Sequence, residues 1–330
     1  MRRYAYARVG NGEDLDMLTW RYSRLLALAA LPFCMLLAKP SAAADKPIKI
    51  VVTAAFVSNA GLDVYDSIAE YLTKKTGLKI EVVSGLSYGE ADKALADGSI
   101  ALGAVCGLPY IHKTSEYELV AVPVMATEAG RWEDAPGYAK AIGKYYSYTI
   151  VKKDSKFKGW EDLRGKTYAF NDMGSNSGYN MPRHKLVSLG EKSWKYFSKV
   201  VVSGSHEESI RLVSEGIVDA SSVDSLVLDY DRANGDPYSN KVRIVEVLGK
   251  DVGGLGAPPI VMSKKADLSK KTVIQDAFIN MHNDPEGQKI LERALLKKFI
   301  VGEDSNFDDI RRWEKDAQDA GFVDWKAEQG

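Results

Sequence analysis

Short β-branched segments alternate with segments of helical periodicity along most of this chain, and this alternation restricts the fold more than any other feature. The first series has predicted strands at 48–52, 79–83 and 101–106, with helices at 63–76 and 90–97 between them. Gly77 and Gly98 follow the two helices as stop signals. Repeated strand–helix–strand units predict a parallel sheet with right-handed crossovers.

A second series of the same kind begins after an extended segment at 146–151. Its predicted strands are 166–170, 199–202, 218–223 and 242–247, and its predicted helices are 179–189 and 206–215. Residues 259–262 return to the first series, and helices follow at 271–282, 285–296 and 308–320. The pattern predicts an α/β protein with two βαβ lobes, one of residues 45–148 plus 250–330 and one of residues 149–249. Ligands of such sheets bind beyond the carboxyl ends of the strands, in a cleft between the lobes.

The N-terminal segment has the order of a secretory signal. Arg21 and Arg24 precede an apolar run at 25–38, and small residues follow at 41–44. We therefore expect residues 1–44 to be a signal peptide that is cleaved on export to the periplasm, with Met17 as an alternative start. A lipid anchor on Cys34 is disfavoured, because bulky residues and not small ones precede this cysteine.

Composition argues against several classes of function. The formal net charge of −1 gives no basic field for nucleic acid. The four histidines are scattered, and no Cys/His spacing of a zinc site occurs, so we expect no metal and no cofactor. No Gly-x-Ser-x-Gly elbow is present, and an enzyme is disfavoured. Cys106 is interpreted as a small core residue on a strand.

Two predicted helix starts carry the polar groups of a candidate site. Ser175, Asn176 and Ser177 stand between a strand and a helix, where backbone N–H groups and the helix dipole form an anion site. Ser203 to His206 repeat this arrangement after the next strand, and His206 can donate a hydrogen bond to an oxyanion. The alternatives are a helix cap for the serines and a surface or capping role for the histidine.

Segment 168–224 resembles the phosphonate-, phosphite- and phosphate-binding proteins of ABC importers. The motifs that carry the resemblance are 175–178 with Pro182, 203–206, 216–220 and 223–225, and upstream 87–91, 107–110 and 145–147. The resemblance implies the type 2 periplasmic-binding fold, with two crossings at a hinge between the lobes. It also implies ligand-binding roles for Ser175, Asn176, Ser177 and His206, and for the cleft tyrosines Tyr88 and Tyr145, with Tyr110 nearby. Asp224, two positions before the place of the family's acid, completes the set of expected ligand-binding residues.

The resemblance also implies the function. We expect a periplasmic, monomeric component of an ABC importer, which binds a small oxyanion such as a phosphonate or phosphite by hinge closure and passes it to the inner-membrane permease. Leu226 stands where aminophosphonate binders place an acid, which disfavours 2-aminoethylphosphonate. A segment from Arg131 to Lys144 looks inserted at the cleft mouth. A sensory binding protein and a binder of a different organic solute remain alternatives.

Overall fold

The computed structural model describes residues 46–53, 61–126 and 143–323. The predicted signal peptide lies outside these ranges, as do Arg131, Trp132, Tyr138 and Lys140 of the predicted insertion. Within the described ranges, no helix is both long enough and apolar enough to cross a membrane.

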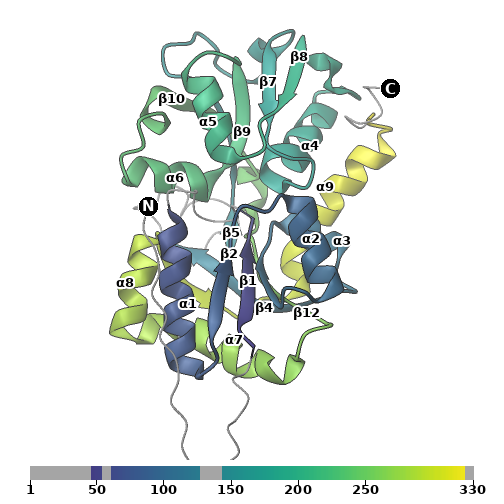
Figure 1. The fold of residues 1–330 in the computed structure, drawn as a ribbon. Coiled ribbons are helices and arrows are strands. Elements are labelled where there is room, and N and C mark those ends of the chain that lie inside the picture. Colours follow the sequence, from purple (N-terminus) through teal and green to yellow (C-terminus); the bar gives the residue numbers. More distant parts are fainter. Residues whose placement is uncertain (1–45, 54–60, 127–142, 324–330) are drawn as a thin grey trace, which may run out of the picture. The chain divides into compact units, whose positions relative to one another are not determined.

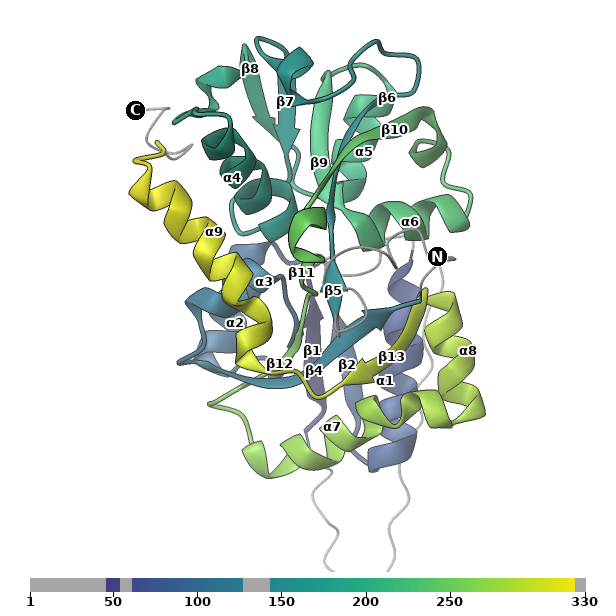
Figure 2. The same ribbon diagram turned by 180° about the vertical axis from the view of Figure 1, so that it is seen from behind.

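The first sheet is mixed and has the strand order β13-β4-β12-β3-β1-β2. Figure 1 labels β1, β2, β4 and β12, and Figure 2 adds β13. Its strands are β1 (Ile48–Val52), β2 (Ile80–Val83), β3 (Leu102–Ala104), β4 (Tyr117–Met125), β12 (Ile260–Ser263) and β13 (Leu296–Ile300). Strand β1 pairs in parallel with β2 and β3, whereas β12 runs antiparallel to β3 and β4. In this sheet the predicted parallel arrangement therefore holds for β1, β2 and β3, whereas β4, β12 and β13 pair antiparallel.

The helices of the first sheet include those predicted from apolar periodicity and capping residues. They are α1 (Leu62–Thr76), α2 (Tyr88–Asp97), α3 (Gly107–His112), α7 (Lys271–Ile279) and α8 (Pro285–Arg293). The apolar stripe Val64, Ile68 and Leu72 of α1 is buried, and Gly77 ends the helix in the left-handed conformation at φ 72°. Ser87 and Glu90 form a capping box at the start of α2.

The predicted helix 285–296 is too long. Helix α8 ends at Arg293, Leu295 has a φ of 55°, and the chain then continues as β13. Strand β13 pairs with β4, and its Phe299 ring lies 5.0 Å from that of Phe278 in the core. Strand pairing and burial, which depend on distant residues, here override the local helical pattern.

The second sheet has the strand order β10-β6-β9-β7-β8. Its strands are β6 (Ser147–Lys152), β7 (Thr167–Phe170), β8 (Lys199–Val202), β9 (Ala220–Asp224) and β10 (Val242–Leu248). Strand β7 is parallel to β8 and β9, and β6 is antiparallel to β9 and β10. A π-helical turn (Asn176–Asn180) continues directly into α4 (Met181–Ser188). The other helices of this sheet are α5 (His206–Ser214) and α6 (Ser225–Ala233), and α6 was not predicted.

Three segments link the two sheets. Strands β5 (Lys144–Tyr145) and β11 (Leu255–Gly256) belong to the two crossings and pair with each other antiparallel. Helix α9 (Asp308–Asp319) is a third link, which the two-crossing prediction did not include (Figure 2). Its Glu314 lies 2.7 Å from His112 of α3, and its Trp313 stacks on His184 of α4 with 4.3 Å between ring centroids.

Candidate functional site

Three helix starts follow neighbouring strands of the second sheet. Ser175 follows β7, Ser205 follows β8 and Asp224 ends β9. Each caps its helix: Ser175 Oγ accepts from Gly178 N at 2.9 Å, Ser205 Oγ from Glu208 N at 3.1 Å, and Asp224 Oδ1 from Leu226 N at 2.8 Å. Because these strands are parallel neighbours, their three carboxyl ends lie at the same edge of the sheet.

Asn171, directly after β7, connects this strand end to the helix start after β8. Its Nδ2 donates to Ser205 O at 3.1 Å and to Ser209 Oγ at 2.9 Å. The backbone at Gly178 passes so close to this side chain that a Cβ atom there would lie 1.4 Å from Asn171 Oδ1. The glycine of the sequence motif therefore allows the first turn after β7 to pack against the linking asparagine.

His206 is buried in its neutral form with a defined tautomer. Its Nδ1 accepts a hydrogen bond from Asp224 N at 3.1 Å, so the ring proton must sit on Nε2. Burial lowers the pKa of His206 to about 3, and the ring carries no charge at neutral pH. The side chain is 1% exposed. It can therefore offer one N–H donor, but no positive charge, to a bound oxyanion.

Tyr145 of the first crossing and Cys106 beside the first sheet contact the helix start after β7. Asn176 Nδ2 donates to Tyr145 Oη at 3.0 Å, and Asn176 N donates to Cys106 Sγ at 3.2 Å. Burial, followed by the charges of Cys106, Asp172 and Asp224, raises the pKa of Tyr88 well above its usual range. We call Tyr88, Cys106, Tyr145, Asn176, Ser177, His206 and Asp224 the polar cluster.

Ser177 places a buried hydroxyl in this cluster, close to the hydroxyl of Tyr145. Its side chain is fully buried, and its Oγ makes no hydrogen bond of normal geometry within the described part of the chain. The same residue is held in place through its carbonyl, which accepts from Ser147 Oγ at 2.7 Å. A buried hydroxyl without a partner is costly unless a ligand or water satisfies it.

Burial disfavours the charged forms of both Tyr145 and Asp224. Burial is the main reason that the pKa of Tyr145 lies well above its usual range, and Asn176 and Ser177 oppose this rise only in part. Burial likewise raises the pKa of Asp224 well above its usual range, against the opposing hydrogen bond from Leu226 N. The cluster thus consists of neutral hydrogen-bonding groups around one buried carboxyl.

Seven of the eight residues predicted from the sequence lie at this edge of the second sheet or contact it, and Tyr110 is separate. Its hydroxyl donates to Asp304 at 3.0 Å, and its ring centroid lies 4.4 Å from that of Phe307. The Tyr110 side chain therefore packs under the 3₁₀ turn Asp304–Phe307, and its link to the polar cluster is through the backbone, where Tyr110 N donates to Cys106 O at 3.2 Å.

Cys106 is the cluster member that sequence reasoning assigned to the core. It is buried, as predicted, but it lies at the N-cap of α3 and not on a strand, because β3 ends at Ala104, and its sulfur also accepts a backbone hydrogen bond from Asn176. Burial raises the pKa of the thiol, which therefore stays protonated. The signal that could have found it is its position two residues after the apolar strand β3, because ligand sites lie beyond the carboxyl ends of such strands.

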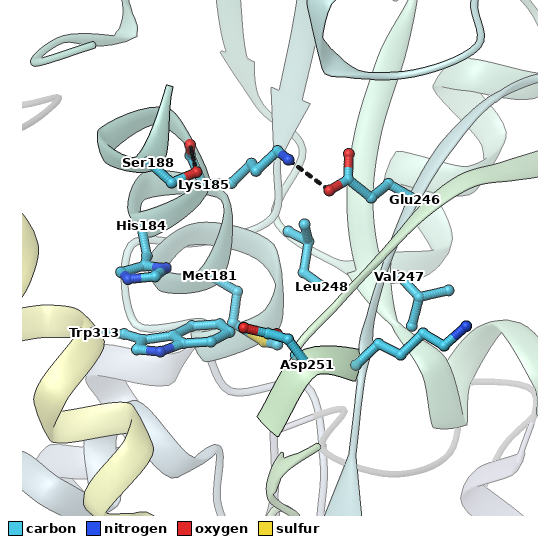
Figure 3. Close-up of a pocket in the computed structure, with 11 residues that line it drawn as sticks. Met181, His184, Lys185, Ser188, Glu246, Val247, Leu248, Asp251 and Trp313 are labelled. Carbon is cyan, nitrogen blue, oxygen red and sulfur yellow. Dashed lines mark hydrogen bonds and ion pairs between the residues drawn. The ribbon is translucent and has the colours of Figure 1, made fainter. Parts of the chain in front are cut away.

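A separate hollow lies beside the second crossing (Figure 3). It has a volume of about 510 Å³, and its walls come from α4, the end of β10 with residues 249–251, and α9. Lys185 pairs with Glu246 at 2.6 Å on one side, and the stacked His184 and Trp313 form another side. None of the predicted site residues lines this hollow.

Comparison with known families decides the affiliation of this chain. Residues 50–307 match the family described as ABC transporter, phosphonate, periplasmic substrate-binding protein. The chain belongs to this phosphonate-binding family. It is a family of substrate-binding transport proteins, and the predicted affiliation is confirmed.

Individual relatives of this member of the family are distant. The phosphate-import protein PhnD of Mycolicibacterium smegmatis is 24% identical over 173 residues, which are 50% of this chain and 51% of that protein. Serotransferrin-1 of Salmo salar is 27% identical over 171 residues, which are 52% of this chain and 22% of the transferrin. The chain thus spans about half of the first relative's length and less of the second's.

Solved structures support the type 2 periplasmic-binding fold. A binding protein of a Pseudomonas aeruginosa ABC phosphonate transporter has a TM-score of 0.72 at 18% identity, covering 84% of this chain and 88% of the other. A Prochlorococcus marinus protein in complex with methylphosphonate has a TM-score of 0.68 at 18% identity, covering 83% and 98%. The predicted fold class is therefore confirmed.

Proposed function

We propose that this phosphonate-family protein binds a small oxyanion, such as a phosphonate or phosphite, at the polar cluster and delivers it to an ABC permease. It acts in the periplasm as a monomer, without catalysis and without a nucleic-acid partner. The observation that carries the proposal is Ser177 Oγ, a buried hydroxyl with no hydrogen-bond partner of normal geometry in the described residues, beside the neutral donor His206. These groups match an anion that accepts several hydrogen bonds.

Hinge closure gives this site its mechanism. Asn176, at the helix start after β7, donates to Tyr145 of the first crossing and to Cys106, which is the N-cap residue of α3 beside the first sheet. A ligand that contacts both groups favours the closed arrangement by its differential affinity for it. The permease then recognises that closed form. A sensory protein that reports the ligand to a membrane receptor would use the same site.

A thermal-shift screen tests the ligand class. Phosphonates, phosphite, phosphate, sulfonates and carboxylates are added separately to the exported chain. We expect phosphorus oxyanions to raise the melting temperature most, because a ligand that binds only the folded state stabilises it more the tighter it binds. A larger rise with carboxylates and none with phosphorus oxyanions would contradict the proposal.

Replacing Ser177 by alanine should weaken oxyanion binding about tenfold, the effect of one hydrogen bond to a charged group. Stability should change little, because the hydroxyl makes no hydrogen bond of normal geometry in the described chain. Titration calorimetry with methylphosphonate measures the affinity. Tyr110→Phe is the matched control, since it removes a hydroxyl that bonds to Asp304 outside the cluster. Equal affinities of Ser177→Ala and wild type would remove the site assignment.

A further inference from the structure

The polar cluster has an unusual balance of charge for an anion site. Asp224 is 1% exposed, and burial keeps its carboxyl away from water. The titratable groups that act on it, or on Tyr88 beside it, are Tyr88, Cys106, Tyr145, Asp172, Glu207 and Asp229. None of these is cationic, and no lysine or arginine of the described chain forms an ion pair with Asp224.

His206 does not supply the missing positive charge. Its Nδ1 is occupied by Asp224 N at 3.1 Å, and the buried ring is neutral. One oxygen of Asp224 caps α6 through Leu226 N at 2.8 Å, which fixes the carboxyl at the sheet edge where the helix starts lie. An oxyanion bound there would meet a carboxylate in a buried, low-dielectric environment. Two adjacent buried negative charges cannot both persist, because each strongly disfavours the other.

We propose that Asp224 and the bound oxyanion share one proton, so that Asp224 acts as a specificity-determining residue for oxyanions carrying an acidic hydroxyl. This rests on the proposed oxyanion function. The proton lies on a hydrogen bond between the carboxyl and a ligand oxygen, and no covalent bond changes. The ligand class is the singly protonated phosphonate, phosphite or phosphate. A fully deprotonated ligand binds only when Asp224 itself holds the proton.

The proposal predicts a proton-linked affinity. When the pH is above both the second pKa of methylphosphonate and the pKa of Asp224 in the ligand-free protein, neither partner carries the shared proton. Binding must then take up one proton from solution, and wild-type affinity should fall about tenfold per pH unit. Asp224→Asn should remove this slope, because its amide N–H donates directly to the dianion. Asparagine also caps helices as well as aspartate does, so the variant should fold.

Titration calorimetry with methylphosphonate tests this over a pH series that brackets the ligand's second pKa, in two buffers of different ionisation enthalpy. Such buffer pairs give the number of protons taken up. Wild type should approach one proton at the highest pH and Asp224→Asn should stay near zero. Asp219→Asn is the control: Asp219 accepts from Thr167 N at the other end of β9, and its variant should keep the wild-type slope.

The outcomes separate this inference from the proposed function. Wild-type binding with no proton uptake, or with the same slope as Asp224→Asn, would overturn the shared proton and leave oxyanion binding intact. An absence of binding to any phosphorus oxyanion at every pH would overturn both. A thermal melt of each variant verifies that the folded protein is being titrated.

Discussion

Replacing His206 by alanine is expected to weaken oxyanion binding about 10- to 100-fold. The variant loses the Nε2–H donor, and hydrogen bonds to charged partners contribute about 1.5–3 kcal/mol. It should also lose about 1–3 kcal/mol of stability, because Asp224 N, which donates to the ring at 3.1 Å, would be left buried without a partner. Titration calorimetry and denaturant unfolding measure the two effects.

Two amide substitutions separate these roles of His206. The Oδ1 of His206→Asn can occupy the place of Nδ1 and accept from Asp224 N, so stability should be largely kept and affinity lost. In His206→Gln, the longer side chain places its amide near the position of Nε2, so it should recover part of the oxyanion affinity that His206→Ala loses. It should not restore the hydrogen bond from Asp224 N. Equal behaviour of the two variants in both measurements would contradict the assigned tautomer.

The same ring makes stability depend on pH. Because burial lowers the pKa of His206 to about 3, below its usual value of about 6.5, the unfolded state binds a proton more readily between these values. The contribution of His206 to stability is therefore fully present above about pH 6.5 and is lost as pH falls towards 3. Unfolding of His206→Asn should lack this part of the acid dependence.

Replacing Gly178 by alanine should cost at least about 2 kcal/mol of stability and remove most oxyanion binding. The new Cβ would lie 1.4 Å from Asn171 Oδ1, so the asparagine side chain must move. Its bonds to Ser205 O and Ser209 Oγ would break, which detaches the helix start after β7 from the helix start after β8. Denaturant unfolding and calorimetric titration provide the measurements.

A double-mutant cycle isolates that contact. Asn171→Ala removes the clashing atoms, so Gly178→Ala should be at least about 1 kcal/mol less costly in the Asn171→Ala background than in wild type. Gly174→Ala is the matched control, because its nearest atoms, in Asp172 and Tyr88, lie 3.2 Å or more away. Additive effects of the Asn171 and Gly178 substitutions would show that the close approach is not the cause.

Local sequence was sufficient for the elements that start and end by their own caps. Helix α1 has its apolar stripe and ends before Gly77, and the capping box of Ser87 and Glu90 starts α2. Local sequence was insufficient at 293–300. There Leu295 adopts a φ of 55°, and β13 forms by pairing with β4, which lies about 170 residues earlier in the chain.

The helix starts of the candidate site could likewise be placed from the sequence, because strand, cap and helix follow one another within a few residues. Ser175 and Ser205 cap as their motifs indicate, and His206 begins α5. The partners across the sheets could not be placed in this way. Cys106 meets Asn176, 70 residues away, and Tyr110 turns to Asp304, 194 residues away.

By itself, the sequence determined the α/β alternation, the family and the polar helix starts, since each depends on neighbouring residues that carry their own propensity and capping groups. Only the tertiary structure decided which groups share one buried environment. The tautomer of His206 and the shifted pKa of Asp224 arise from contacts between strands and from exclusion of water, and neither has a counterpart in local sequence.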